Sequence, residues 1–181
     1  MSRSAIFIDR DGTLNVEKNY LHKWEDWEWI PGAVEAIKRF NVAGYLVIVT
    51  SNQAGVARGL YGEADVDALH RQVDADLQHQ GGHIDAYYYC PHHPEHGDVR
   101  DCECRKPAPG MLLKAALAHD IDLLHSYIIG DKVSDVETGL NCGVTPILVE
   151  TGYGAQERME LPPAVLVVRD IGAAAEWILN M

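Results

Sequence analysis

The sequence predicts an α/β fold, a doubly wound parallel sheet with helices on both faces. Short apolar runs alternate with longer stretches of helical periodicity, and this alternation is typical of such sheets. Apolar residues make up 47% of the 181 residues, which is enough to bury a sizeable core. No repeat, low-complexity tract or linker interrupts the alternation, so we expect a single domain over residues 1–181.

The apolar runs are the expected strands, at 5–8, 45–50, 84–90, 126–131, 144–150 and 164–170. Amphipathic spacing between them predicts helices at 32–44, 63–82, 109–120, 133–143 and 171–180. Functional side chains of an open parallel sheet gather at the carboxyl ends of the strands. The polar residues that follow each strand are therefore the site candidates.

The net charge of −12 restricts the classes of partner. The acidic balance without a basic stripe argues against nucleic-acid binding. No apolar run is long enough for a membrane span or a signal peptide, so we expect a cytoplasmic protein without a membrane partner. If the substrate is an anion, the chain must gather its few cations, and a metal, at one spot.

The first expected strand runs into the segment DRDGT, which places Asp9 and Asp11 two residues apart. Residues i and i+2 of an extended chain project to the same side, so these carboxylates are expected to crowd one spot. Such a pair suits an acid/base couple, a nucleophile with an acid beside it, or a Mg²⁺ site. Asp and Gly are also common in helix-capping turns, so the segment alone leaves a structural role open.

Polar residues follow three later segments, and each group alone is typical of an ordinary loop, a solvated pair or a helix cap. They supply hydroxyl and amide groups, then two cations, then two carboxylates around a lysine: Ser51, Asn52 and Gln53; Arg105 and Lys106; Asp131, Lys132 and Asp135. The adjacent cations provide the local positive charge that an acidic chain needs to bind an anion.

Together these segments read D-x-D-G-T, a hydroxyl residue, a lysine and G-D-x-x-x-D, in that order and each in the expected context. This pattern resembles the haloacid dehalogenase superfamily over about residues 5–135. The resemblance implies a Rossmann-like haloacid dehalogenase fold and transfer of a phosphoryl group to an aspartate. Asp9 would be the nucleophile, and Asp11 would protonate the leaving alkoxide and then deprotonate the attacking water.

The same resemblance implies groups that hold the phosphoryl oxygens and a metal. Ser51 and Lys106 would bind the phosphoryl oxygens. Mg²⁺ would be bound by Asp9, the backbone carbonyl of Asp11, and Asp131. A phosphate monoester and an aspartate repel each other, and Mg²⁺ together with Lys106 would offset that repulsion.

This chemistry requires opposite protonation states of the two aspartates in DRDGT. Asp9 must be ionised to attack, which Mg²⁺ and Lys106 favour. Asp11 must arrive protonated, and we expect the neighbouring carboxylate and partial burial to raise its pKa. By the same resemblance, Asp135 would orient the site without itself binding the metal.

Three of the four cysteines lie in the segment CPHHPEHGDVRDCECRKP, residues 90–107. Cys90, His92, Cys102 and Cys104 suit tetrahedral Zn²⁺ with no open position, which is a structural site. A disulfide between Cys102 and Cys104 would close a strained ring, and cytoplasmic thiols stay reduced. We therefore predict a zinc loop over residues 90–104.

The zinc would position residues rather than take part in the chemistry. Lys106 follows Cys104 by two residues, so the metal would fix Arg105 and Lys106 over the phosphate. Three further residues stand outside the predicted ligand set: His93 and His96, either of which could replace His92, and Cys142, which we expect in the core.

The gaps between motifs indicate an uncapped site. One loop and one helix separate Asp11 from Ser51, and one helix and one strand separate Ser51 from Cys90. Neither gap has room for a separate cap domain, so short loops must confer specificity. An uncapped domain of this size is expected to be a monomer.

The loops at 15–32 (NVEKNYLHKWEDWEWIPG) and 52–59 (NQAGVARG), with the zinc loop, resemble the D-glycero-D-manno-heptose 1,7-bisphosphate 7-phosphatases over nearly the whole chain. Those enzymes remove the 7-phosphate on the route to ADP- or GDP-heptose for lipopolysaccharide or surface glycans. The match implies contacts between a sugar bisphosphate and these residues: Glu17, Lys18, Asn19 and Tyr20; Ser51, Asn52 and Gln53; Arg105, Lys106 and Lys132; and, for the distal phosphate, Arg58.

Other functions stay open at this stage. The histidinol-phosphate phosphatases share the nucleophile and zinc motifs, although GVARG fits them poorly and their zinc loop is generally shorter. A receiver-like phospho-acceptor domain would share the sheet and the aspartates, but it carries its acceptor later in the chain. A zinc-dependent interaction module would not explain Asp9, Asp11 and Asp131.

Two local questions also stay open. In VTSNQ, either Thr50 or Ser51 could supply the hydroxyl that binds the phosphoryl group. Trp24, Trp27 and Trp29 could stack on a sugar, but alternating residues more often pack a loop onto the core, and we expect packing.

Overall fold

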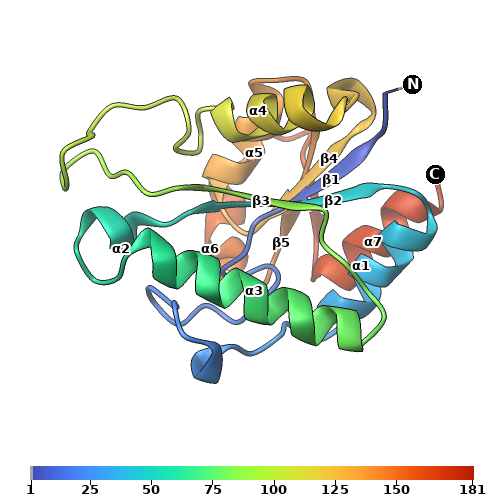
Figure 1. Ribbon diagram of the computed structural model, residues 1–181. Helices are drawn as coiled ribbons and strands as arrows, with labels where there is room; N and C mark the ends of the chain where they lie inside the picture. The colour runs from blue at the N-terminus through green and yellow to red at the C-terminus, as the bar shows by residue number, and fades with distance from the viewer. Residues whose placement is uncertain (1) are drawn as a thin grey trace.

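A single parallel sheet forms the centre of the computed structural model, which describes residues 2–181 (Figure 1). Its strands are β1 (Ala5–Ile8), β2 (Leu46–Asn52), β3 (Ala86–Cys90), β4 (Tyr127–Gly130), β5 (Thr145–Val149) and β6 (Leu166–Val168). Their order in the sheet is β3-β2-β1-β4-β5-β6, and every pair is parallel. The chain moves outward from β1 to β3 and then returns to β4, so the switch point lies between β1 and β4.

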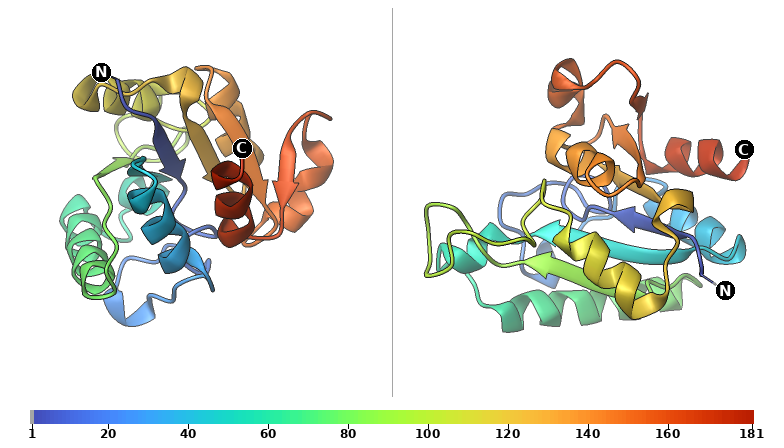
Figure 2. Two further views of the ribbon diagram at one scale, coloured as in Figure 1. Left: turned by 90° about the vertical axis from the view of Figure 1, so that its right-hand side faces the viewer. Right: turned by 90° about the horizontal axis from the view of Figure 1, so that it is seen from above.

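Helices cover both faces of the sheet, as Figure 2 shows. They are α1 (Ala33–Val42), α2 (Ala54–Ala57), α3 (Glu63–His79), α4 (Gly110–His119), α5 (Val133–Leu140), α6 (Gly154–Glu157) and α7 (Ile171–Leu179). Helices α1 and α7 pack on one face with the end of α3, and α4 packs on the other. Three short 3₁₀ turns lie at Trp24–Asp26, Leu123–His125 and Arg158–Glu160.

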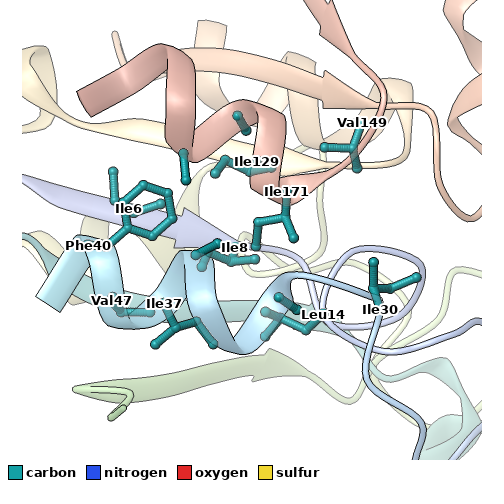
Figure 3. Packing of buried hydrophobic residues seen from close by; sticks show 14 of the residues in the cluster. Ile6, Ile8, Leu14, Ile30, Ile37, Phe40, Val47, Ile129, Val149 and Ile171 are labelled. Atoms are coloured by element: carbon teal, nitrogen blue, oxygen red, sulfur yellow. The ribbon is translucent and has the colours of Figure 1, made fainter. Parts of the chain in front are cut away.

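Alternating side chains of the central strand enter two separate cores. Ile6 and Ile8 of β1 pack with Ile37 and Phe40 of α1 in the larger core (Figure 3). Phe7, on the opposite face of the strand, packs in the core under α4. Because β1 is buried on both faces, the polar residues that follow it start from a rigid position.

The structure confirms the predicted doubly wound α/β sheet and all of its strands. The predicted helices extend past the observed ends, because glycine turns end α1 and α3 earlier than the amphipathic pattern does. The single-turn helices α2 and α6 were not predicted, since one turn is too short to show periodicity. Residues 2–181 contain no helix that is long and apolar enough to cross a membrane. They also contain no inserted cap domain.

Candidate active site

A buried cluster of carboxylates lies at the carboxyl ends of the two central strands. Asp9 follows β1, Asp131 follows β4, and Asp135 lies in the first turn of α5. Carboxylate oxygens of the three residues all lie within 4.8 Å of one another. Since β1 pairs with β4 at the switch point, the topology of the sheet itself brings Asp9 and Asp131 together.

Lys106 supplies the positive charge of this cluster. Its Nζ lies 2.7 Å from Oδ1 of Asp9 and 2.6 Å from Oδ1 of Asp135, and it donates to the carbonyl of Thr50 at 2.9 Å. Burial lowers the pKa of Lys106, but the charges of Asp135 and Asp9 outweigh burial and leave the pKa raised. Lys106 is therefore a fixed cation beside Asp9.

Asp131 is the carboxylate that this lysine leaves uncompensated. Its Oδ2 accepts a hydrogen bond from the backbone N–H of Tyr153 at 2.8 Å, whereas its buried Oδ1 has no partner. Burial and repulsion from Asp9 and Asp135 raise the pKa of Asp131 to about 8. An unpartnered oxygen and surplus negative charge fit a hard divalent cation such as Mg²⁺.

Two glycines, Gly12 and Gly152, lie very close to the Asp131 carboxylate. A Cβ atom at Gly12 would lie 2.3 Å from Oδ2 of Asp131, and one at Gly152 would lie 2.1 Å from it. Gly12 also has φ +89°, a left-handed conformation that disfavours other residues. The glycine of DRDGT is thus required by both contact and backbone conformation.

Asp11 lies near the carboxylate cluster but does not belong to it. It forms an ion pair with Arg10 at 2.9 Å and accepts hydrogen bonds from Asn15 at 3.0 Å and Gln53 at 3.2 Å. Burial raises the pKa of Asp11, but the Arg10 charge and these hydrogen bonds outweigh burial and leave the pKa lowered. The expectation of a raised pKa was wrong for the free chain, because Arg10 turns onto Asp11.

A cavity of about 380 Å³ opens above these groups. Most of the sequence-predicted site residues line it: Asp9, Asp11, Glu17, Asn19, Tyr20, Ser51, Asn52, Gln53, Arg105, Lys106, Lys132 and Asp135. Asn19 and Tyr20 have left-handed backbones, with φ of 49° and 58°, in the loop that brings them there. Groups from the ends of several strands thus meet at one opening, as the sequence predicts.

Lys18 and Arg58 do not line this cavity. Nζ of Lys18 donates to the carbonyl of Asp26 at 2.9 Å and lies 3.1 Å from Glu28, so it is held on the other side of its loop. Arg58 lies at the rim, with its guanidinium 5.8 Å from the ring centre of Tyr20.

The structure distinguishes Ser51 from Thr50. Ser51 lines the cavity, whereas Thr50 contributes its backbone carbonyl to Lys106 and has a fully buried side chain. Adjacent residues of a strand point to opposite faces, and here Ser51 is the one that faces the site.

The four predicted zinc ligands meet at the base of the loop between β3 and α4, where the start of the loop (Cys90, His92) comes together with its end (Cys102, Cys104). This loop projects beyond the sheet in Figure 1. Sγ of Cys104 lies 2.8 Å from Sγ of Cys90, 3.4 Å from that of Cys102, and 3.3 Å from Nδ1 of His92. Ligands of tetrahedral zinc lie about 3.3–3.8 Å apart, given Zn–N and Zn–S bonds of about 2.0–2.3 Å. The Cys90–Cys104 distance is shorter than this range, but the other two, and the 3.6 Å between Sγ of Cys90 and Cys102, lie within it. Three thiols and an imidazole grouped in this way form a donor set that suits zinc.

The spare histidines stay apart from this group. His93, Glu95 and His96 form a separate cluster, and the Arg58 guanidinium lies 3.4 Å from Nε2 of His93. Cys142 packs against the core under α4, as expected.

The expected packing of the tryptophans is also confirmed. Trp24, Trp27 and Trp29 pack around Leu69 and Val73 of α3 and do not line the cavity.

Four residues near the site were missed by sequence reasoning: Arg10, Asn15, Tyr61 and Tyr153. Arg10 and Asn15 hold Asp11, while Tyr61 and Tyr153 line the cavity. The one signal in the sequence was the position of Arg10 between two aspartates. It went unused because an arginine is ordinarily expected to be exposed.

Comparison with known proteins identifies the family. The HAD-hydrolase-like family matches residues 103–174. The D-glycero-beta-D-manno-heptose-1,7-bisphosphate 7-phosphatase of Yersinia pestis is 38% identical over 181 residues, covering 97% of this chain and 89% of that protein. The D-glycero-D-manno-heptose-1,7-bisphosphate 7-phosphatase of Thermosynechococcus vestitus is 41% identical over 191 residues, covering 98% and 96%. The chain belongs to this phosphatase family.

A solved structure agrees with this membership. The D,D-heptose 1,7-bisphosphate phosphatase from B. bronchiseptica, complexed with magnesium and phosphate, has a TM-score of 0.88 and 36% identity over 98% of both chains. As a member of the heptose bisphosphate phosphatase family, the chain is a phosphoric monoester hydrolase with an uncapped haloacid dehalogenase fold. The two non-enzymatic interpretations do not fit this family.

Proposed function

We propose that this phosphatase removes the 7-phosphate of D-glycero-D-manno-heptose 1,7-bisphosphate through an aspartyl-phosphate on Asp9. The observation that carries the proposal is the pairing of Asp9 with the fixed cation Lys106, 2.7 Å away at the floor of the cavity. The names of the relatives support the choice of substrate. The product would feed the synthesis of ADP- or GDP-heptose.

In the first step, a carboxylate oxygen of Asp9 attacks phosphorus. The Asp9–phosphorus bond forms as the bond between phosphorus and the sugar oxygen breaks, and Asp11 gives its proton to that oxygen. In the second step, Asp11 takes a proton from water while the water oxygen forms a bond to phosphorus. The bond between phosphorus and Asp9 breaks, which releases phosphate and restores the Asp9 carboxylate. Lys106 and Ser51 hold the phosphoryl oxygens in both steps.

The lowered pKa of Asp11 bears on the order of these events. The ionised form present in the free chain is already the base that the second step needs. The first step needs a proton on Asp11, and a dianionic phosphate bound beside it favours protonation by raising the pKa of the carboxyl. Substrate binding, rather than the free site, would therefore prepare the acid.

Two metals complete the proposal. Asp9, Asp131 and the backbone carbonyl of Asp11 would hold Mg²⁺, which would neutralise charge on the phosphoryl oxygens. Cys90, His92, Cys102 and Cys104 would hold a structural Zn²⁺. Thiolate ligands must stay reduced, which supports a cytoplasmic location.

Three further predictions accompany this proposal: a single domain over residues 1–181, a monomer, and a sugar bisphosphate as the only partner. Sedimentation of the purified protein would test the predicted monomer.

Phosphate release with Mg²⁺ tests the substrate. The two anomers of heptose 1,7-bisphosphate are compared with histidinol phosphate, with and without a chelator. We expect a clear preference for one heptose anomer and loss of turnover with the chelator. A preference for histidinol phosphate would replace the substrate but keep the nucleophile, while equal turnover with chelator would refute the Mg²⁺ site.

A further inference from the structure

Tyr61 lines the cavity of the candidate active site, although it belongs to none of the sequence motifs described above. It lies after α2, in the segment GLYG, and is 8% exposed. Its hydroxyl donates to Oε1 of Gln53 at 2.7 Å. Nε2 of Gln53 in turn donates to Oδ2 of Asp11 at 3.2 Å and to Oγ of Ser51 at 2.5 Å. One buried hydrogen bond thus links Tyr61 to two groups of the proposed chemistry.

The direction of these hydrogen bonds is fixed by chemistry. An ionised Asp11 can only accept, so the NH₂ group of Gln53 must face it, and the amide oxygen must face Tyr61. Tyr61 must therefore donate. Burial raises the pKa of Tyr61 to about 12, so its hydroxyl keeps the proton that it donates.

The opposite orientation of the Gln53 amide would disable both neighbours. Its oxygen would then face the Asp11 carboxylate and repel it. The same oxygen would also accept the hydroxyl proton of Ser51, which would no longer be free to donate to a phosphoryl oxygen. The orientation seen here leaves that proton available.

Local packing prevents Tyr61 from moving away. Its ring stacks on His22 with centroids 4.7 Å apart and planes at 16°. Gly55 makes room for the hydroxyl end of the ring, since a Cβ atom at this position would lie 2.6 Å from the hydroxyl oxygen. Any larger residue at position 55 would displace the ring.

We propose that Tyr61 is a positioning residue, whose hydroxyl fixes the Gln53 amide so that it presents NH₂ to both Asp11 and Ser51. This inference rests on the proposed function, in which Asp11 transfers the proton and Ser51 holds a phosphoryl oxygen. Tyr61 also lines the cavity, but the role proposed for its hydroxyl is exerted through Gln53.

A double-mutant cycle on the metal-loaded enzyme tests the proposal. Tyr61→Phe removes only the hydroxyl, and we expect about a tenfold loss of kcat, the size of one buried hydrogen bond. In a Gln53→Leu background, we expect Tyr61→Phe to cause no further loss. The same factor in both backgrounds, or an unchanged rate for Tyr61→Phe alone, would overturn the proposal.

Tyr87→Phe is the matched control. Like Tyr61, Tyr87 donates a hydrogen bond from its hydroxyl at 2.7 Å, but its acceptor, Asp74, does not line the cavity. Both variants are expected to lower the melting temperature slightly, but only Tyr61→Phe lowers kcat. Equal losses of kcat in the two would indicate a general structural effect and refute positioning.

A leaving-group comparison adds a readout that a structural defect does not move. An aryl phosphate needs little protonation of its leaving group, so Tyr61→Phe should slow its first-turnover cleavage less than that of a sugar phosphate. Gly55→Ala should reproduce this pattern by displacing the ring. An equal slowing of both substrates in both variants would contradict the proposal.

Asp11→Asn separates the two levels of the argument. If Asp11→Asn abolishes turnover while Tyr61→Phe has no effect, only the inference about Tyr61 fails. If Asp11→Asn turns over normally, the proposed function itself fails, whatever Tyr61 does.

Discussion

The carboxylates of the candidate active site and the predicted zinc loop are positioned by different physical means. Asp9 and Asp131 follow paired central strands, so backbone hydrogen bonds and two apolar cores hold them. Residues 91–109 contain no helix or strand, and Lys106 is the one residue among them that is buried. The side chains of Cys90, His92, Cys102 and Cys104 come together at the base of this segment. The carboxylates are thus positioned by the sheet, and Arg105 lies next to a cluster of side chains that a metal would join. Lys106 is held from both directions, because its ammonium group contacts Asp9 and the carbonyl of Thr50 and its backbone bonds to the side chain of Asn52.

The largest effect should come from the floor. Asp9→Asn is expected to lower kcat by roughly 10⁴-fold or more, because an amide oxygen does not form the phosphoryl intermediate. The melting temperature should not fall, since the substitution also removes repulsion from Asp131 and Asp135. Steady-state kinetics and thermal unfolding measure the two quantities, and substantial turnover would remove Asp9 as the nucleophile.

A change in the loop should have a smaller effect that differs in kind. Cys102→Ser is expected to abolish stoichiometric zinc and to lower activity about 10- to 100-fold, by loosening Arg105 and Lys106. Metal analysis and kinetics are compared with Cys142→Ser, which alters a thiol outside the cluster. Full zinc content and normal kinetics in Cys102→Ser would show that the loop does not depend on this ligand.

A pH titration should separate the stability of the scaffold from that of the loop. His70 of α3 is buried and stacks on Tyr87 at 4.2 Å, and burial lowers its pKa from 6.5 to about 3. The unfolded chain therefore binds the proton first, and stability that is complete above pH 6.5 is lost as the pH falls toward 3. By pH 5 this loss amounts to about 2 kcal/mol.

Chemical denaturation at several pH values measures that loss. His70→Gln should remove the His70-dependent part of the slope, and the exposed His79→Gln should keep it. The difference should persist in Cys102→Ser, because His70 belongs to the scaffold. A His70→Gln profile that matches the parent would assign the acid sensitivity to other groups.

The smallest effect should come from a lysine that the sequence, but not the structure, places in the site. Lys18→Ala is expected to change kcat/KM by less than about twofold, because its ammonium group binds Asp26 and Glu28 on the surface. Lys132→Ala, which removes a cation from the cavity, should raise KM by more. Equal effects in the two variants would indicate that Lys18 contacts the substrate after all.

The elements and most of the site followed from the sequence, because strand patterns and metal-ligating residue types are local signals. Cys90, Cys102 and Cys104 could be grouped by residue type alone, and the sheet places Asp9 beside Asp131 through its topology.

The surroundings of Asp11 did not follow, because the strand ends at Ile8 and the i, i+2 rule no longer applies beyond it. The backbone turns at Arg10, whose carbonyl accepts from the N–H groups of Leu14 and Asn15. This turn folds Arg10 onto Asp11, and no spacing in the sequence indicates such a contact. The hydrogen bond between Gln53 and Tyr61 was likewise not predictable, because it depends on the path of the chain through α2 and belongs to no motif.

The two glycines behind Asp131 have a consequence for the order in which the site is made. Gly12 and Gly152 both press on this carboxylate, and the hydroxyl of Thr151 donates to the carbonyl of Gly12 at 2.6 Å. The loop after the first strand is therefore completed by the loop after the fifth. During synthesis, the proposed nucleophile Asp9 therefore leaves the ribosome long before the site can be finished, because the site is incomplete until residue 152 has been added.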